Sequence, residues 1–419
     1  MRSLSEMETA AAPIETPCCI VGGGPAGMML GFLLSRAGVD VIVIEKHADF
    51  LHDFRGDTIH PSTLELMSEL DILEEFLKRP HQELKELAGQ VGNEVIKIAN
   101  FTHLPTHCKF LALMPQWDFL NFIVEQAARY PGFHVRMQTQ ATDLIEQDGR
   151  IVGVKAKTPD GVIEIRATLT VAADGRHSIL RQRASLQVID LGAPMDVFWM
   201  RISRRPNDPG QSLGHVEPGK MFVKIDREDY WQCAFLIPKG AADEVRNRGI
   251  EQFREDIANL EPLFRDRVSE LHDWNDVSLL TVKVDRLHQW SRPGLLCIGD
   301  AAHAMSPVGG VGINLAIQDA VAAANILGAK LASGNLSDSD LRAVQRRREF
   351  PTRAMQKLQV AVQNRVIQRV LSGSQPLTVP RIVRLMRQWP SLRRIPARII
   401  GIGFRPEHVR TSEKPAQGR

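Results

Sequence analysis

A glycine-rich segment near the N-terminus constrains the fold more than any other feature of the sequence. Gly22, Gly24 and Gly27 follow a short apolar run, residues 18–21, and open a helix-like stretch over residues 25–37. In the pattern GxGxxG the first glycine allows a tight turn, the second lets backbone approach a pyrophosphate, and the third permits close helix packing. Because a second apolar strand follows, the order strand, turn, helix, strand predicts a βαβ unit and an α/β fold with a parallel sheet.

A carboxylate ends that second predicted strand, residues 39–45. Glu45 lies about 20 residues beyond the glycines, where its side chain can accept hydrogen bonds from the hydroxyls of an adenosine ribose. The helix N-terminus would then face the phosphates, which predicts a dinucleotide site without separating FAD from NAD. A guanidinium in the next loop, Arg55, could neutralise the diphosphate. The predicted contacts in this segment are Gly22, Gly24, Pro25, Ala26, Gly27, Glu45, Lys46 and Arg55.

Two later segments carry further polar strand ends. An apolar run over residues 171–173 ends in Asp174 and Gly175, and a second one leads into Asp300 and a glycine-rich loop up to Asn314. Asp300 could hold a sugar hydroxyl, while the loop presents backbone N–H groups at a helix start. Such a helix end stabilises negative charge, which favours a reduced flavin ring over a nicotinamide. Taken singly, each segment also fits a turn or a helix cap that binds nothing.

These three motifs in this order resemble the FAD-dependent aromatic monooxygenases of the para-hydroxybenzoate hydroxylase type, which broadly include the ubiquinone-biosynthesis hydroxylases. The resemblance implies that the glycines and Glu45 hold the ADP half of FAD, and that Asp174 and Gly175 contact FAD and assist nicotinamide binding. It implies that Asp300 holds the ribityl chain. The residues expected to wrap the flavin ring are Pro307, Gly310, Val311, Gly312, Ile313 and Asn314, and Arg55 and Gln116 stand where this family often places further FAD contacts.

The same resemblance implies an activity. NAD(P)H would reduce FAD, O2 would add to the reduced ring as a C4a-hydroperoxide, and its distal oxygen would hydroxylate or epoxidise an aromatic or polyketide-like small molecule. Pro307, Gly310 and Gly312 are expected nearest to the flavin, and no substrate-side catalytic residue is assigned. Two alternatives stay open. One is a geranylgeranyl-reductase-like flavoprotein that consumes no oxygen, and the other is a non-enzymatic flavin-binding redox sensor.

The remaining strand patterns predict a second, smaller domain interleaved with the first. Its strands are expected at 195–202, 221–225, 230–238 and 277–284, with a helical stretch near 250–271. The predicted organisation is a loose tail over 1–16, a Rossmann-like FAD-binding domain over 17–85, 112–190 and 286–360, an antiparallel-sheet substrate domain over 86–111 and 191–285, and a basic helical C-terminal region over 361–419.

The second sheet supplies the candidate pocket residues. Trp199, Arg201, Phe222, Trp231 and Phe235 could face the flavin, although side chains that alternate along strands also form ordinary core. With only two tyrosines in the chain, a pair of tyrosines that ionises a phenolic substrate is not expected.

Charge and cysteine content limit the partners. A net charge of +3 with no broad excess of one sign argues against nucleic acid as a partner. Five scattered cysteines predict buried thiols in a reducing compartment and no metal site. The sequence has no apolar run long enough for a spanning helix and no signal-peptide pattern, so a cytoplasmic location is expected. Ten arginines and one acid between Arg365 and Arg410 fit a packed or solvated helix pair, or a weak contact with a membrane surface. A monomer or a homodimer is expected.

Overall fold

Parallel strands form the centre of the first sheet, as the βαβ pattern predicts. The computed structural model describes residues 12–50, 56–92, 94–209, 213–373 and 381–414. Neighbouring strands in the parallel part are, in spatial order, β20 (Leu295–Cys297), β11 (Gly161–Ala172), β1 (Ile14–Val21), β2 (Val41–Ile44) and β8 (Phe133–Arg136). The antiparallel strands of this sheet are β19 (Ser291–Arg292), β10 (Arg150–Thr158) and β9 (Gln140–Gln147).

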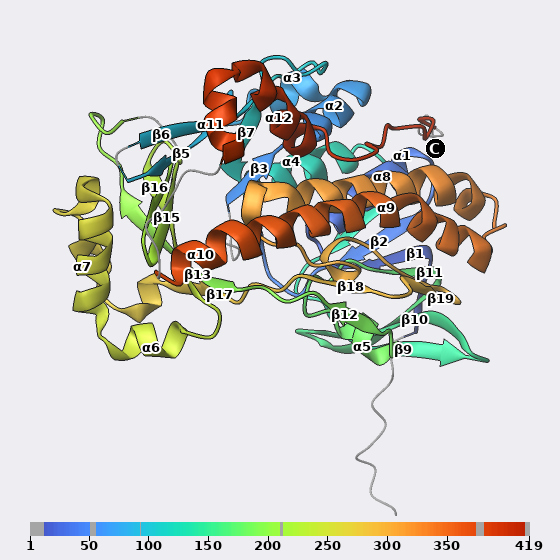
Figure 1. Ribbon diagram of the computed structural model, residues 1–419. Coiled ribbons are helices and arrows are strands. Elements are labelled where there is room, and N and C mark those ends of the chain that lie inside the picture. Colours follow the sequence, from blue (N-terminus) through green and yellow to red (C-terminus); the bar gives the residue numbers. More distant parts are fainter. Residues whose placement is uncertain (1–11, 51–55, 93, 210–212, 374–380, 415–419) are drawn as a thin grey trace, which may run out of the picture.

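Helices cover one face of this sheet. Figure 1 shows α1 (Pro25–Arg36), α8 (Val311–Ala332) and α9 (Asp338–Val362) on one side of it, with the ribbon of β9 and β10 on the other. Because α1 packs against the sheet and against α8, ten of its twelve residues are buried. With its preceding turn, α8 is long and apolar enough to cross a membrane, but most of it is buried inside the protein as a core helix. The other helices of this part are α2 (Pro61–Glu69), α3 (Leu73–Phe76), α4 (Gln116–Ala127) and α5 (Ile179–Arg183).

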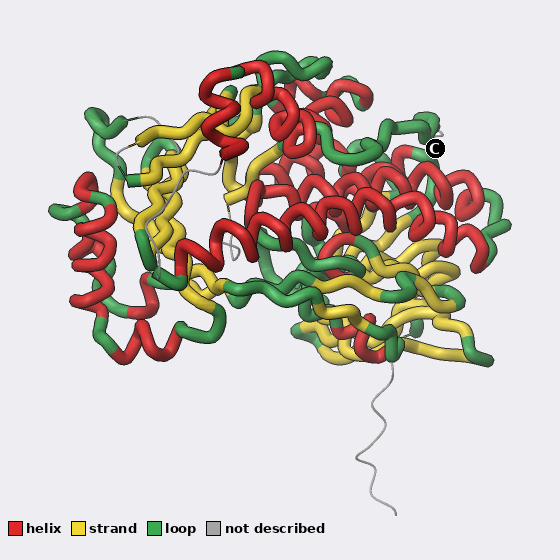
Figure 2. Tube along the Cα trace, viewed as in Figure 1, coloured by secondary structure: helices red, strands yellow, loops and turns green. Residues whose placement is uncertain are grey.

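A second, mostly antiparallel sheet stands beside the first (Figure 2). Its seven strands are, in spatial order, β17 (Ser278–Leu280), β13 (Met195–Ser203), β16 (Tyr230–Pro238), β15 (Lys220–Asp226), β14 (Leu213–Glu217), β5 (Glu86–Val91) and β6 (Glu94–Asn100). One of its faces buries aromatic side chains under α6 (Ala242–Asn247) and α7 (Ile250–Leu260). The remaining strands form two small sheets. One contains β3 (Gly56–Ile59), β7 (Leu111–Pro115) and β4 (Gln82–Leu84), and the other contains β12 (Val188–Asp190) and β18 (Asp285–Leu287).

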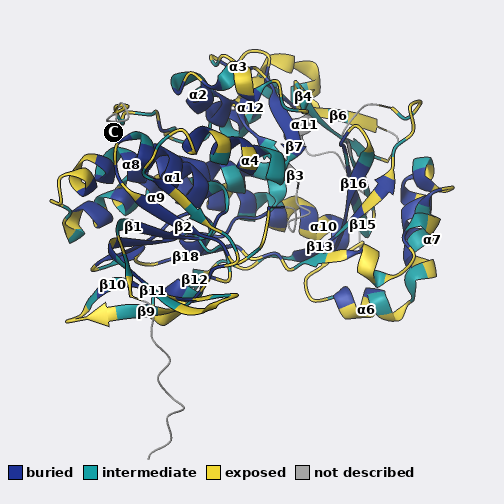
Figure 3. Cartoon of the chain, turned by 180° about the vertical axis from the view of Figure 1, so that it is seen from behind, coloured by how far each residue is buried: buried dark blue, intermediate teal, exposed yellow. Residues whose placement is uncertain are grey.

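A long helical rod connects the two sheets. α9 continues through a π-helical segment, Gln363–Ile367, into α10 (Gln368–Leu371), which contacts β15 and β16. The C-terminal region is helical, with α11 (Arg381–Gln388) and α12 (Arg394–Gly401), and the residues after α12 return along α8. Figure 3 shows the buried core in the helix-covered sheet and the more exposed residues on β9, α6 and α11.

The element boundaries differ from the expected ones in four places. β1 begins at Ile14, so the last residues of the expected tail pair with β11, while residues 1–11 lie outside the described chain. The expected strand over 277–284 forms only as β17, because the Val282 N–H donates to the Asp196 side-chain carboxylate and not to a backbone carbonyl of β13. The expected helix over 250–271 ends at Leu260, since proline at 262 disfavours helical backbone before it. The expected domain limit at residue 360 falls inside the continuous rod of α9 and α10.

Candidate active site

The predicted motifs meet at one edge of the parallel sheet. Val21 of β1, Ala172 of β11, Cys297 of β20 and Ile44 of β2 lie in one register row at the carboxyl ends of their strands. The segments that follow them contain the glycine motif, Asp174 and Gly175, Asp300, and Glu45. Ligands of open α/β sheets bind at this edge, beyond the carboxyl ends of the strands. The register therefore brings together residues that are up to about 280 positions apart in the chain.

The glycine loop is closely packed on one side and open on the other. A side chain at Gly22, whose φ is +111°, would come within 2.3 Å of the Ala173 carbonyl oxygen, and one at Gly27 would come within 2.0 Å of the Gly22 carbonyl oxygen. At Gly24, the residue before the first turn of α1, no atom lies within 4 Å of the position that a Cβ would occupy. The loop therefore leaves room for a ligand beside the N–H groups of α1.

Glu45 lies against this loop. Its Oε2 accepts a hydrogen bond from the Gly23 N–H at 2.7 Å, and its Oε1 accepts one from the His47 N–H at 3.1 Å. Lys46, the next residue, is exposed. A carboxylate oxygen can accept more than one hydrogen bond, so Glu45 keeps acceptor capacity for ribose hydroxyls.

The second motif carries a buried acceptor without a partner. Asp174 Oδ2 accepts hydrogen bonds from the N–H groups of Ile179 and Leu180 at 2.9 and 3.3 Å, which fixes the start of α5. Its Oδ1 is buried and has no hydrogen-bond partner among the described residues. Burial raises the pKa of Asp174, and hydrogen bonds from Ser178 and from backbone N–H groups oppose the rise. Beside it, Gly175 has a φ of +81° and open space at its Cβ position.

The third motif is joined to the second by an ion pair. Arg176 Nη2 lies 3.2 Å from Asp300 Oδ2, and Arg176 Nη1 is buried without a partner among the described residues. The pair orients Asp300, whose side chain is 28% exposed, toward the edge of the sheet. Arg176 was not among the residues expected at the site. Its position directly after Asp174 and Gly175 was the available signal.

The start of α8 is built from two glycines and held by Asn314. Gly309 and Gly310 have φ of +79° and +61°, and a side chain at Gly310 would meet Thr58 Oγ1 at 2.8 Å. Asn314 Oδ1 accepts hydrogen bonds from the His60 N–H (2.9 Å) and Thr63 Oγ1 (2.8 Å), and Nδ2 donates to the carbonyls of Thr58 (2.9 Å) and Gly310 (3.2 Å). All four hydrogen-bonding positions of the amide are thus used within the protein. The Asn314 side chain therefore positions the loop, and a contact of Asn314 with the flavin, through its backbone, stays a prediction.

Five of the remaining predicted contacts lie in the described part of the chain. Gln116 opens α4 directly after Pro115, which pairs with Gly56 of β3. Pro307 precedes the turn before α8, and Val311, Gly312 and Ile313 are the first three residues of this helix. Arg55 lies outside the described residues.

The electrostatics of this edge suit an anion. Partial burial and the cations Lys283, Arg176, Arg181 and Lys46 lower the pKa of His177, which follows the second motif. The open glycine position, the unpartnered Asp174 and Arg176 atoms and this positive field together fit the diphosphate and hydroxyl groups of FAD.

Comparison with known proteins decides the family. Residues 15–358 match the model of the FAD binding domain family. The 6-methylpretetramide 4-monooxygenase of Streptomyces rimosus is 31% identical over 389 residues, which cover 92% of each chain. This chain belongs to the FAD-dependent aromatic monooxygenases. The para-nitrophenol 4-monooxygenase of a Pseudomonas strain is 25% identical, over 79% of this chain and 82% of its own. The P. aeruginosa PqsL structure with 2-aminobenzoylacetate shares the fold, with a TM-score of 0.73 and 21% identity over 86% of this chain and 98% of its own.

The second sheet of the monooxygenase turns one apolar face toward the glycine-rich segment before α8, residues 307–310, which we call the cofactor loop. Val308 packs against the cluster that contains Val197, Ala234 and Leu236, and Trp199 packs against the same cluster. Arg201 follows two residues after Trp199 on this face, and its guanidinium lies 3.8 Å from the ring centroid of Tyr230. The register of β13 thus puts Trp199 and Arg201 on the face that meets Val308, and their place beside the flavin stays a prediction.

Three of the five predicted pocket residues lie on the opposite face. Phe222, Trp231 and Phe235 pack under α7 with Phe253 and Phe264, so their proposed role in the pocket is wrong. Sequence alternation separates the two faces of a strand but does not say which face meets the cofactor. These three residues were predicted to line the pocket only because they are aromatic and lie on strands of the second sheet.

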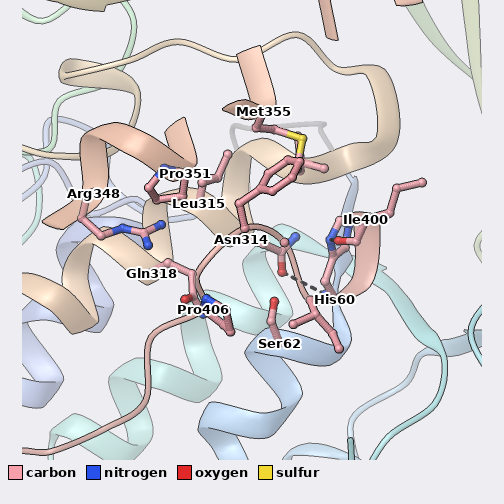
Figure 4. A pocket seen from close by; sticks show the side chains of 14 residues that line it. His60, Ser62, Asn314, Leu315, Gln318, Arg348, Pro351, Met355, Ile400 and Pro406 are labelled. Carbon is pink, nitrogen blue, oxygen red and sulfur yellow. Dashed lines mark hydrogen bonds between the residues drawn. The ribbon is translucent and has the colours of Figure 1, made fainter. Parts of the chain in front are cut away.

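A small cavity lies behind the start of α8 (Figure 4). Its volume is about 30 Å³, and its walls include His60, Asn314, Arg348, Met355 and Ile400. A cavity of this size holds water and is too small for an aromatic substrate. His60 forms one wall: its Nδ1 lies 2.7 Å from the Ile400 carbonyl oxygen, and its Nε2 is buried without a partner among the described residues. His60 could not be assigned this place from sequence, because Ile400 is 340 residues away in the chain.

Proposed function

We propose that this monooxygenase uses NAD(P)H and O2 to hydroxylate or epoxidise an aromatic or polyketide-like small molecule. The observation that carries the proposal is the apolar face of β13, β15 and β16, which meets the cofactor loop at Val308. Electron-rich rings bind to faces of this kind mainly through apolar contact, with a few polar groups to orient them. The names of the two curated relatives, both monooxygenases, support the same reaction class.

The residues of the chain have separable roles in this reaction. Bound FAD would supply the redox chemistry that links NAD(P)H and O2 to the substrate. Glu45 and the N–H groups at the start of α1 would hold its ADP half, and Asp174, Arg176 and Asp300 would hold the polar chain between its rings. The N–H groups at the start of α8 would stabilise negative charge on the flavin. Apolar side chains on the second sheet would exclude water from the reacting ring.

The reaction class is tested with isotopically labelled oxygen and with anaerobic kinetics. We expect NADH or NADPH to reduce the flavin, an aromatic ligand to accelerate that reduction, and one atom of ¹⁸O2 to appear in the product. Reduction of a substrate double bond without oxygen uptake would instead identify a reductase. Failure of both nucleotides to reduce the flavin would indicate a different electron donor or a non-enzymatic role.

We also propose a cytoplasmic location and a monomer or homodimer. Five buried free cysteines support a reducing compartment. Contact of the C-terminal region with a membrane surface stays a secondary proposal. Leu385, Trp389 and Ile395 are exposed among arginines there, whereas Glu407 is buried with Arg348 inside the protein. Sedimentation with anionic liposomes tests it, and a negative result would leave packing as the role of this region.

A further inference from the structure

The two faces of the second sheet are buried to different degrees. Along β15, Phe222, Lys224 and Asp226 point toward the α7 side and are buried. Met221, Val223 and Ile225 point the other way, toward the cofactor loop, and are only half-buried. A contiguous apolar face that stays partly open in a folded protein is a typical feature of ligand-binding grooves and of protein interaction sites.

One register row of this face contains two glycines. Trp199 pairs with Ala234, Ala234 with Val223, Val223 with Gly214, and Gly214 with Gly89. Paired residues of neighbouring strands project to the same side of a sheet. Beyond Val223, therefore, the face has no side chain on β14 or β5 in this row.

Neither glycine is required by the backbone or by packing. Their φ angles lie outside the left-handed region, and the atom nearest to an added Cβ is 3.8 Å away at Gly214 and 3.6 Å away at Gly89. These are ordinary contact distances, so a Cβ atom at either position would clash with no other part of the protein. Glycine inside a strand lowers stability, and it often marks a β-bulge or a site where a ligand or another backbone approaches closely. The register shift of the β5–β6 pair lies between Leu87 and Ala88, so it does not include either glycine.

Trp199 gives an independent indication of a ligand in the same row. Its indole Nε1 is buried and has no hydrogen-bond partner among the described residues. A buried N–H group without a partner is costly, and a ligand oxygen would satisfy it.

We propose that Gly89 and Gly214 keep a flat apolar shelf open for a planar substrate of several fused rings, with a carbonyl or hydroxyl oxygen at Trp199 Nε1. This inference rests on the proposed function and deepens it. From Ala234 to Gly89 the shelf crosses three strand intervals, or roughly 14 Å at ~4.8 Å each. That length exceeds what a single aromatic ring can cover.

The test fills the shelf and compares ligands of two sizes. Gly89→Val and Gly214→Val, singly and together, are titrated with 1,8-dihydroxyanthraquinone and with resorcinol, using the change in flavin absorbance. Ala88→Val is the matched control, because it places the same side chain on the opposite face of β5. Thermal unfolding of each variant is measured in parallel.

The shelf predicts a size-selective effect. We expect the double variant to bind the anthraquinone at least about tenfold more weakly, to bind resorcinol as the wild type does, and to unfold at the same or a higher temperature. A merely structural role would weaken both ligands and lower the unfolding temperature. Unchanged anthraquinone binding, or equal loss of both ligands, would overturn the shelf and leave the proposed function intact. A wild-type protein that binds neither ligand and is not reduced faster with any aromatic compound would overturn the proposed function itself.

Discussion

His303 Nε2 lies 2.5 Å from Asp319 Oδ2, and both side chains are fully buried beneath the Asp300 motif. Asp319 Oδ2 also accepts a hydrogen bond from the Gly299 N–H at 3.1 Å, and Asp319 Oδ1 accepts one from Arg348 Nε at 3.0 Å. Burial by itself would raise the pKa of Asp319, but His303 and Arg348 lower it, so the group is a carboxylate at neutral pH. The carboxylate thus ties α8 and α9 to the backbone that presents Asp300.

Removal of that charge should destabilise the protein and loosen the cofactor site. In Asp319→Asn the buried guanidinium of Arg348 loses its ion pair with the Asp319 carboxylate. We expect the free energy of unfolding to fall by about 3 kcal/mol. Urea unfolding and FAD titration of the apoprotein measure the two effects. Asp338→Asn is the control, because its ion pair with Arg150 is well exposed and contributes at most about 1 kcal/mol. Equal behaviour of the two variants would contradict the anchoring role of Asp319.

Gly24→Ala should separate FAD binding from folding. The Cβ position at Gly24 is open and its backbone is extended, so an alanine fits the apoprotein without strain. The methyl group would occupy the space through which a pyrophosphate approaches α1, and FAD affinity should fall by about tenfold or more. Gly22→Ala provides the contrast, because it clashes with Ala173 and should lower stability as well. Thermal unfolding of the apoproteins and FAD fluorescence titration distinguish the two variants. Undiminished FAD binding by Gly24→Ala would place the cofactor elsewhere.

Local motifs were predictable from sequence, whereas contacts between distant segments were not. Gly22, Glu45, Asp174 and Asp300 each follow an apolar strand directly, and parallel strands align their carboxyl ends, so their convergence follows from the βαβ pattern. The hydrogen bonds of the Asn314 side chain could not be predicted, because its partners Thr58 and Thr63 lie about 250 residues away in the chain.

The substrate domain shows why the orientation of the second sheet and part of its strand pairing could not be predicted from the sequence. The strands β13 and β16 were located correctly, but the choice between Trp199 and Trp231 depends on which face α7 covers. That choice is made by tertiary packing, and a shift of one residue would exchange the two faces. Strands β5 and β6 carry no clean alternation of apolar and polar residues, so the pairing of β6 with β5 and of β5 with β14 could not be predicted from the pattern.

His60 should make stability depend on pH in the acid range. Burial lowers its pKa from 6.5 to about 4, although the carbonyls of Ile400 and Gly309 favour the protonated form. The unfolded state therefore binds more protons than the native state between pH 6.5 and 4, so stability falls as the pH falls through this window. At pH 5 the loss amounts to about 2 kcal/mol relative to pH 7.5. His60→Asn keeps a donor near the position of Nδ1 and should remove this part of the slope. Urea unfolding of both proteins at pH 7.5 and pH 5 gives the comparison, and parallel slopes would show that His60 is not responsible.

Trp199→Phe should weaken only ligands that carry an oxygen acceptor. Phenylalanine keeps most of the apolar area in the cluster with Val223 and Ala234, but it lacks the indole N–H that is buried without a partner among the described residues. Loss of one hydrogen bond corresponds to about 0.5–1.5 kcal/mol, or up to about tenfold in affinity. Paired titrations with 1,8-dihydroxyanthraquinone and the hydrocarbon anthracene measure the difference. We expect a weaker anthraquinone complex and an unchanged anthracene complex. Equal changes for the two ligands would mean that Trp199 contributes through packing alone, because the hydrocarbon has no acceptor for its N–H.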